Sequence, residues 1–115
     1  SVGKCLLAYS EEALRESILQ RIAFERYTDR TITDAAALRI QLDEIRDKGY
    51  AMDDGEISED ITCIAAPVRN HSGDVIYSVG ISGPKQRIRE KQIDTLAEHL
   101  IETAGRLSEQ LGYSR

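Results

Sequence analysis

Hydrophobic residues in the first part of the chain recur at the three- and four-residue spacing of α-helices. Ser1 can cap a short apolar helix over residues 3–9. Ser10, followed by two glutamates, predicts the start of a second helix that ends near Arg21. The predicted buried stripe of this second helix consists of Leu14, Ile18, Leu19 and Ile22.

A third helix is predicted by signals at both of its ends. Thr33 or Asp34 can cap its start, because short polar side chains accept the free N–H groups there. The pair Lys48-Gly49 supplies a cation and a left-handed cap at its end. Its predicted hydrophobic stripe is formed by Leu38, Leu42 and Ile45.

After residue 49 the pattern changes to the two-residue alternation of β-strands. The sequence Asn-His-Ser-Gly at 70–73 separates the last two extended segments and predicts a hairpin, so these strands are expected to be antiparallel neighbours. Gly73 can take the left-handed conformation that such a loop needs. The predicted strands cover residues 50–56, 61–69 and 75–82.

The hairpin register decides which side chains of the two strands share a face. A four-residue loop places Arg69 opposite Asp74 and Cys63 opposite Gly80. A five-residue loop shifts the register by one residue and turns Cys63 away from the face of Gly80. With the four-residue loop, one face of small side chains forms a concave, partly polar floor or, alternatively, a tight seat for a helix. This face comprises Cys63, Ala65, Ser78, Gly80 and Ser82.

The last segment of the chain predicts a long amphipathic helix. The pair Gly83-Pro84 ends the predicted sheet, and Gly112 can cap the helix at its end. Its hydrophobic stripe recurs at spacings of three and four residues. The stripe consists of Ile93, Leu96, Leu100, Ala104, Leu107 and Leu111.

The composition narrows the possible functions. A chain of 115 residues predicts one domain, and its net charge of −5 argues against DNA or anionic membrane binding by this chain alone. No apolar run reaches the roughly 20 residues that a membrane span requires. Two cysteines without a paired motif or a signal peptide favour a cytoplasmic location. Because the chain opens at Ser1 without a methionine, we expect a fragment of a longer protein.

The sequence gives little support for a metal site or for a catalytic site. The acidic segment 53–60 lacks the alternating acids of an EF-hand, and we expect it to form a solvent-exposed hairpin at the rim of the sheet. Cys63 has no histidine or lysine near it in sequence, so we expect a small core residue rather than a nucleophile. His71 and His99 are expected to be ordinary loop and helix residues. We expect no metal and no cofactor.

Five segments in order resemble the C-terminal part of the effector-binding domain of IclR-family transcriptional regulators. The resemblance covers essentially the whole chain and implies an α+β, GAF-like (profilin-like) fold, with an antiparallel sheet, flanking helices and a long C-terminal helix. The winged helix-turn-helix domain and the first strands of such a protein are absent from residues 1–115, so an exposed sheet edge is expected. The segments are SVGKCLLAY, TDRTITD, IRDKGYAMDDGE, ITCIAAPVRNHSGDVIYSVGISGP and SEQLG.

The resemblance also implies a set of effector-binding residues, in which Gly80 stands where many members have serine and Val2 where a smaller residue is common. The local pair Asp54-Gly55 indicates a turn, whereas the family pattern extends the first strand to about Ile57. We follow the family pattern in this prediction. The implied site residues are Ser1, Val2, Gly3, Asp53, Ile61, Cys63, Gly80 and Ser82.

The function expected from this resemblance is that of a non-catalytic sensor of a small molecule, often an organic acid. A homodimer or tetramer is implied, with DNA bound only through the absent N-terminal domain, and no membrane contact. Two alternatives from other classes are a GAF-like thiol enzyme that uses Cys63 and a ligand-free dimerisation module.

Overall fold

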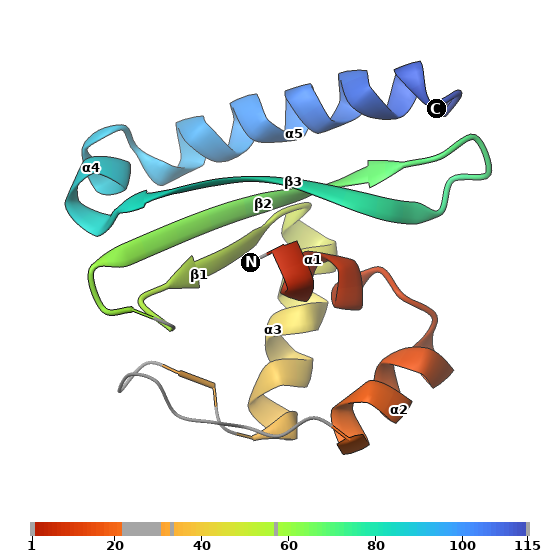
Figure 1. Ribbon diagram of the computed structural model, residues 1–115, viewed down its shortest axis with the longest axis horizontal. Helices are drawn as coiled ribbons and strands as arrows, with labels where there is room; N and C mark the ends of the chain where they lie inside the picture. Colours follow the sequence, from red (N-terminus) through yellow and green to blue (C-terminus); the bar gives the residue numbers. More distant parts are fainter. Residues whose placement is uncertain (1, 22–30, 33, 57, 115) are drawn as a thin grey trace.

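The computed structural model describes residues 2–21, 31–32, 34–56 and 58–114. Its three-stranded antiparallel sheet, in the order β1-β2-β3, has α5 on one face and α1 and α3 on the other (Figure 1). This arrangement confirms the expected α+β class. The elements are α1 (Val2–Ala8), α2 (Glu12–Arg21), α3 (Ala35–Lys48), β1 (Ala51–Asp54), β2 (Ile61–Arg69), β3 (Val75–Pro84), α4 (Lys85–Glu90) and α5 (Ile93–Gln110).

Helix α3 forms as its sequence predicts. Of the two candidate caps, Asp34 is the one observed, and its carboxylate accepts the Ala37 N–H at 2.8 Å. Gly49 ends the helix with a φ of 87°, in the left-handed region that favours glycine. The predicted stripe is confirmed by the burial of Leu38, Leu42 and Ile45.

Helix α2 differs from its prediction in both cap and buried face. The predicted Ser10 cap is not observed: α2 begins at Glu12, no described N–H donates to the Ser10 hydroxyl, and this hydroxyl donates to the Leu6 carbonyl at 2.9 Å. Of the predicted stripe, Leu19 is buried, whereas Leu14 and Ile18 are 54% and 37% exposed; Ile22 lies outside the described residues. An ion pair also connects α2 to α3, because the Arg39 guanidinium donates to both carboxylate oxygens of Glu16.

Strand β1 ends at Asp54, so the extension to Ile57 was wrong and the local turn signal was right. Gly55 takes a φ of 75°, and its N–H donates to the Ile61 carbonyl at 3.0 Å. The Asp53 carboxylate accepts the Glu56 N–H at 2.8 Å, which fixes the turn from inside. Side-chain to backbone hydrogen bonds of this kind compete with the strand ladder and end it.

The β2–β3 hairpin has a different register from the predicted one but the same faces. Arg69 pairs with Val75, so the loop contains residues 70–74, and an irregularity between Val68 and Arg69 inserts one more residue into β3. Each change alone would reverse the faces, and together they restore them. Cys63 therefore pairs with Ser82, and the shared small face is confirmed.

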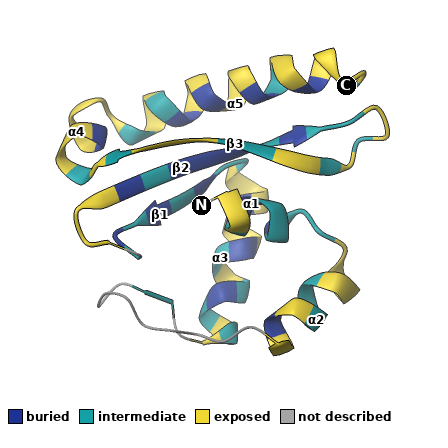
Figure 2. Ribbon diagram, viewed as in Figure 1, coloured by how far each residue is buried: buried dark blue, intermediate teal, exposed yellow. Residues whose placement is uncertain are grey.

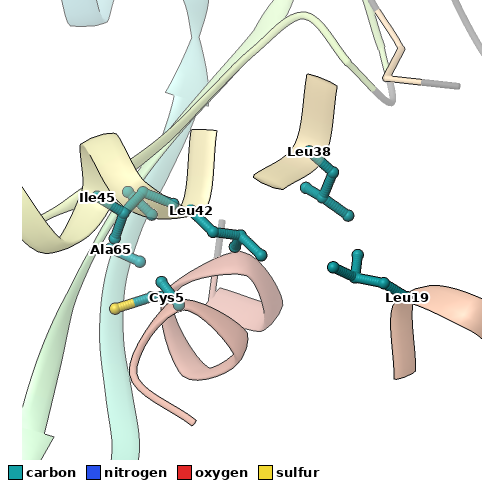
Figure 3. Packing of buried hydrophobic residues seen from close by; sticks show 8 residues of the cluster. Cys5, Leu19, Leu38, Leu42, Ile45 and Ala65 are labelled. Atoms are coloured by element: carbon teal, nitrogen blue, oxygen red, sulfur yellow. The ribbon is translucent and has the colours of Figure 1, made fainter. Parts of the chain in front are cut away.

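The core is divided into two clusters by the sheet. On one face the buried side chains of α1 and α3 pack over Ala51 and Ala65, and Leu19 of α2 joins this cluster beside Leu38 (Figure 3). On the other face α4 and α5 pack against Ile64, Ala66 and Val68. The buried positions accordingly follow the inner sides of the helices and the middle of β2 (Figure 2).

Helices α4 and α5 each differ from the prediction. Helix α4 was not expected, and it contributes the buried Ile88 to the second cluster. On α5 the buried side chains are Ala97, Leu100, Ala104 and Ser108. Leu107 and Leu111, which were placed in the predicted stripe, are 38% and 42% exposed.

Strand β3 lies at one edge of the sheet, and no strand within the described ranges pairs with its outer side. The expected sheet edge is therefore observed, with Ile76 and Tyr77 exposed along it. No helix of the described residues is long and apolar enough to cross a bilayer.

Candidate functional site

A row of three polar side chains crosses the sheet on the face that α1 covers only in part. Asp53 of β1 pairs with Cys63 of β2, and Cys63 pairs with Ser82 of β3. The Cys63 Sγ lies 3.0 Å from the Ser82 Oγ, within hydrogen-bonding distance for sulfur. Asp53 is buried, Cys63 is partly buried and Ser82 is exposed, so the row opens from β1 toward β3.

The neighbouring row has no polar side chain and receives the start of α1. It consists of Ala51, Ala65 and Gly80, paired across the same three strands. A Cβ built on Gly80 would lie 3.0 Å from the Ile64 carbonyl oxygen and 3.4 Å from the Val2 Cγ2. Gly80 therefore lets the first turn of α1 approach the sheet closely.

Helix α1 runs along the strands, and its start points toward the polar row. Val2 lies by Gly80 at one end, and Tyr9, just beyond the other end, lies by Arg69. Helices leave their first N–H groups without intrahelical partners, so those of Val2 and Gly3 are available at this end. Ile61, the next residue of β2 on the same face as Cys63, is 38% exposed. The result is an open patch with donors, acceptors and an apolar margin.

Among the described residues, the Glu56 N–H is the hydrogen-bond partner of the Asp53 carboxylate. The residue is 8% exposed and belongs to the few buried polar residues of the described chain. A buried carboxylate is an acceptor when ionised, and it favours a donor or a cation at its free positions. It can therefore recognise a hydroxyl or N–H group that enters from the open side.

An ion pair beside this site was missed in the sequence. The Lys4 ammonium donates to the Glu56 carboxylate at 2.6 Å, to the Met52 carbonyl at 2.7 Å and to the Gln41 amide oxygen at 3.0 Å. The Lys4 and Glu56 side chains are only 14% and 15% exposed. These contacts attach α1 to β1, α3 and the turn that carries Asp53. No local motif signals a pair this far apart in sequence.

The two thiols have different environments. Burial raises the pKa of the Cys5 thiol, although the nearby Ser78 hydroxyl acts in the opposite direction. Cys63 is partly accessible, and the described hydrogen bonds give it Ser82 as its partner, with no histidine or lysine. The thiolate is the nucleophile, and the contacts of the described residues give neither thiol a histidine or lysine that would stabilise it.

The sheet face gathers the expected site residues that the structure describes. Ser1 lies outside the described residues. No group of three or more histidine, cysteine, aspartate or glutamate side chains that could hold a metal ion occurs in the described part of the chain. The residues gathered on this face or at the start of α1 are Val2, Gly3, Asp53, Ile61, Cys63, Gly80 and Ser82.

Comparison with known proteins gives the family. The family model described as "Bacterial transcriptional regulator IclR C-terminal" matches residues 1–109. The HTH-type transcriptional regulator KdgR of Escherichia coli (strain K12) is 37% identical over 113 residues, which make up 98% of this chain and 43% of that protein. The chain therefore spans less than half the length of this relative.

Solved structures support the same assignment. The C-terminal domain of E. coli KdgR is 38% identical, with a TM-score of 0.89 over 97% of this chain and 68% of that one. The inducer-binding domain of PobR from Acinetobacter, a double mutant in complex with 3-hydroxybenzoic acid, is 28% identical, with a TM-score of 0.85 over 94% and 62%. The resemblance seen in the sequence is confirmed, and the chain belongs to the C-terminal family of IclR-type bacterial transcriptional regulators.

Proposed function

We propose that this chain is the small-molecule-sensing part of an IclR-type transcriptional regulator and that its effector is a small organic acid. The observation that carries the proposal is the polar row of Asp53, Cys63 and Ser82, which opens beside the start of α1. Binding at this row is non-catalytic, since Cys63 contacts a hydroxyl and no general base among the described residues.

Each part of a hydroxy acid has a matching group on this face. The effector carboxylate accepts from the first N–H groups of α1, those of Val2 and Gly3, where the helix dipole also favours a negative charge. A hydroxyl or carbonyl group meets Ser82, and a hydroxyl donates to Asp53. The effector carboxylate lies away from Asp53, because two like charges in contact repel. Ile61 and Cys63 line the apolar side.

A structural neighbour supports this choice of ligand class. The PobR domain was solved with 3-hydroxybenzoic acid, which has one carboxylate and one hydroxyl. The face described above offers an anion-favouring helix start and separate acceptor positions, so a ligand with both groups fits it. The identity of the effector here need not be the same, because Val2 and Gly80 reshape this face.

The regulatory role belongs to the whole protein. We propose that a winged helix-turn-helix domain in the rest of that protein binds DNA and that strands from the rest of the effector domain pair with β3. A homodimer or tetramer and a cytoplasmic location belong to the same proposal. Effector binding regulates only by favouring one arrangement of the domains or subunits over another.

Isothermal titration calorimetry tests the site with defined probes. The protein is titrated with 3-hydroxybenzoate, lactate and pyruvate, and the best binder is then measured with Asp53→Asn and Ser82→Ala. Each substitution is expected to weaken binding by about tenfold, the effect of losing about 1.4 kcal/mol. Asp54→Asn and Ser72→Ala are the matched controls, because Asp54 points to the other face and Ser72 is an exposed loop residue. Equal affinity in all five proteins would overturn the assignment.

A further inference from the structure

A pocket lies at the opposite end of α1 from the sheet-face site. It has a volume of about 230 Å³ and is formed where α1, α3, β2, α5 and the C-terminal turn meet. Its polar wall includes Tyr9, Arg69 and Tyr113, and its apolar wall includes Pro67 and Ile101. None of the expected effector-binding residues is among these.

The pocket results from the difference in length between β1 and β2. Strand β1 begins at Ala51, which pairs with Ala65, so no strand in the described part of the chain pairs with the rest of β2 on that side. Pro67 has no N–H group that would need an acceptor there. The Arg69 N–H donates instead to the Ser108 hydroxyl of α5 at 2.8 Å. The Arg69 N–H at this edge of β2 thus has an acceptor, and the space beside the edge remains open.

The Arg69 side chain is held in place by two aromatic rings. Its guanidinium carbon lies 5.3 Å from the centre of the Tyr9 ring and 5.9 Å from the centre of the Tyr113 ring. One of its N–H groups donates to the Gly73 carbonyl at 2.9 Å. No carboxylate of the described residues forms an ion pair with Arg69. Most of its N–H donors are therefore available to an anion.

A second cation adds to the positive charge at this end of α1. Burial raises the pKa of the Tyr9 hydroxyl, and Cys5 adds to this, whereas Arg69 and Arg46 both act to lower it. Both guanidinium groups are thus close enough to influence the same hydroxyl. Arg46 therefore adds positive charge near the Tyr9 hydroxyl, which favours an anion on this side of the pocket.

We propose that this pocket binds a small carboxylic acid with a flat apolar body, as a site separate from the sheet-face site. The carboxylate pairs with the planar fork of Arg69, which matches two carboxylate oxygens. The apolar body lies against Pro67 and Ile101. A pocket of about 150 Å³ accepts benzene in another protein, so a volume of about 230 Å³ is sufficient for a benzoate-sized ligand.

NMR titration of the protein tests this proposal with benzoate and with benzamide, a neutral molecule of nearly the same shape. Benzoate is expected to produce saturable shifts at the Arg69 Nε–H and at the amides of Gly49, Gly105 and Ser108. Benzamide is expected to bind at least about tenfold more weakly, because it lacks the charge. Equal affinity for the two, or no saturation by benzoate, would overturn the proposal.

Matched variants separate this pocket from other sites. Arg69→Met is expected to abolish the shifts, whereas Arg87→Met, an exposed arginine on α4, leaves them unchanged. If Arg69→Met does not fold, Arg69→Lys keeps the charge, loses the planar fork and is expected to weaken binding by about fivefold or more. Unaltered benzoate affinity in Arg69→Lys then counts against the proposal.

Two further measurements identify the site and the ligand class. Ser82→Ala is expected to leave benzoate binding at this pocket unchanged, so failure of the sheet-face site does not affect this result. Inorganic phosphate is expected to bind more weakly than benzoate, because it gains nothing from the apolar wall. Phosphate binding as tight as that of benzoate would overturn the proposed ligand class.

Discussion

Val2 and Gly80 form one contact, in which the larger side chain on α1 lies over the glycine of β3. A Cβ on Gly80 would lie 3.4 Å from the Val2 Cγ2 and 3.0 Å from the Ile64 carbonyl oxygen. In the sequence these residues are two separate departures from the family pattern, a larger residue at one position and a smaller one at the other. In the structure the two residues are in contact, and the larger side chain at position 2 lies over the position where Gly80 has no side chain.

This contact predicts that Gly80→Ser destabilises the fold and that Val2→Ala partly restores it. Overpacking a close contact costs about 1–3 kcal/mol in the free energy of unfolding. The rescue is partial because the Ile64 carbonyl is backbone and remains in place. Urea unfolding of both single variants and the double variant measures the coupling. Strictly additive effects of the two substitutions would contradict this coupling.

Gly3→Ala is the control for this series. A Cβ on Gly3 would have no atom within 4 Å, and the residue is already helical. Replacing a helical glycine by alanine is expected to raise the free energy of unfolding by about 0.5–1 kcal/mol. Opposite signs for Gly3→Ala and Gly80→Ser would show that the close approach, and not a general effect of glycine, explains the result.

The two cysteines are expected to react with a thiol reagent at different rates. Cys5 is fully buried and burial raises its pKa, so both access and thiolate population are reduced. Cys63 is partly exposed on the sheet face. An aromatic disulfide reagent should therefore modify one thiol rapidly in the folded protein and both thiols in denaturant. Cys63→Ala should remove the rapid phase; two rapid thiols in the folded protein would contradict this placement.

The contribution of Glu16 to stability is expected to decrease in acid. Hydrogen bonds and charge from Arg39 lower the pKa of Glu16 below the ordinary glutamate value of 4.5. A lowered folded-state pKa stabilises the protein above the unfolded value, and this contribution is lost as the pH falls through the folded value.

Unfolding of the wild type and of Glu16→Gln measures this contribution across the pH range. The wild type should be the more stable at neutral pH, and the difference should decline below about pH 4.5. Added salt should reduce the same difference, because the pair lies at the surface. A difference that grows in acid would contradict the assigned direction.

Local signals account for the elements that the sequence predicted well. Helix α3 has an N-terminal cap at Asp34, a glycine cap at Gly49 and a regular stripe between them, and each of these was observed. Ser10 showed the limit of such signals, because α2 begins only at Glu12 and the Ser10 hydroxyl donates to the preceding helix. Helix α4 is short, with Ile88 as its buried residue, and so it had no repeating pattern to detect.

Prediction of the site depended on which face of the sheet each side chain occupies, and less on the exact pairing of the strands. The predicted partner of Cys63 was wrong by two residues, yet an even shift leaves every side chain on the same face. Interior glycine and serine on β3 were therefore enough to locate the open patch. The Lys4–Glu56 pair could not be predicted, because its residues meet only after α1 packs against the sheet.

The hydroxyl of Ser108 is expected to stabilise the uncovered edge of β2. It accepts the Arg69 N–H at 2.8 Å and donates to the Ala104 carbonyl within α5. Ser108→Ala leaves the Arg69 N–H without this acceptor, which is expected to cost about 1–3 kcal/mol in the free energy of unfolding. Hydrogen exchange at the Arg69 amide should accelerate in this variant, since the donor loses its partner.

Thr103→Ala separates this role from the helical hydrogen bond. Thr103 donates to the carbonyl four residues earlier, as Ser108 does, but it is exposed, and the described contacts give it no partner in β2. Its replacement should leave stability unchanged or slightly raised, because alanine favours the helix. If Thr103→Ala and Ser108→Ala were equally destabilising, the effect would belong to α5 alone. A loss confined to Ser108→Ala, together with faster exchange at Arg69, assigns it to the edge of β2.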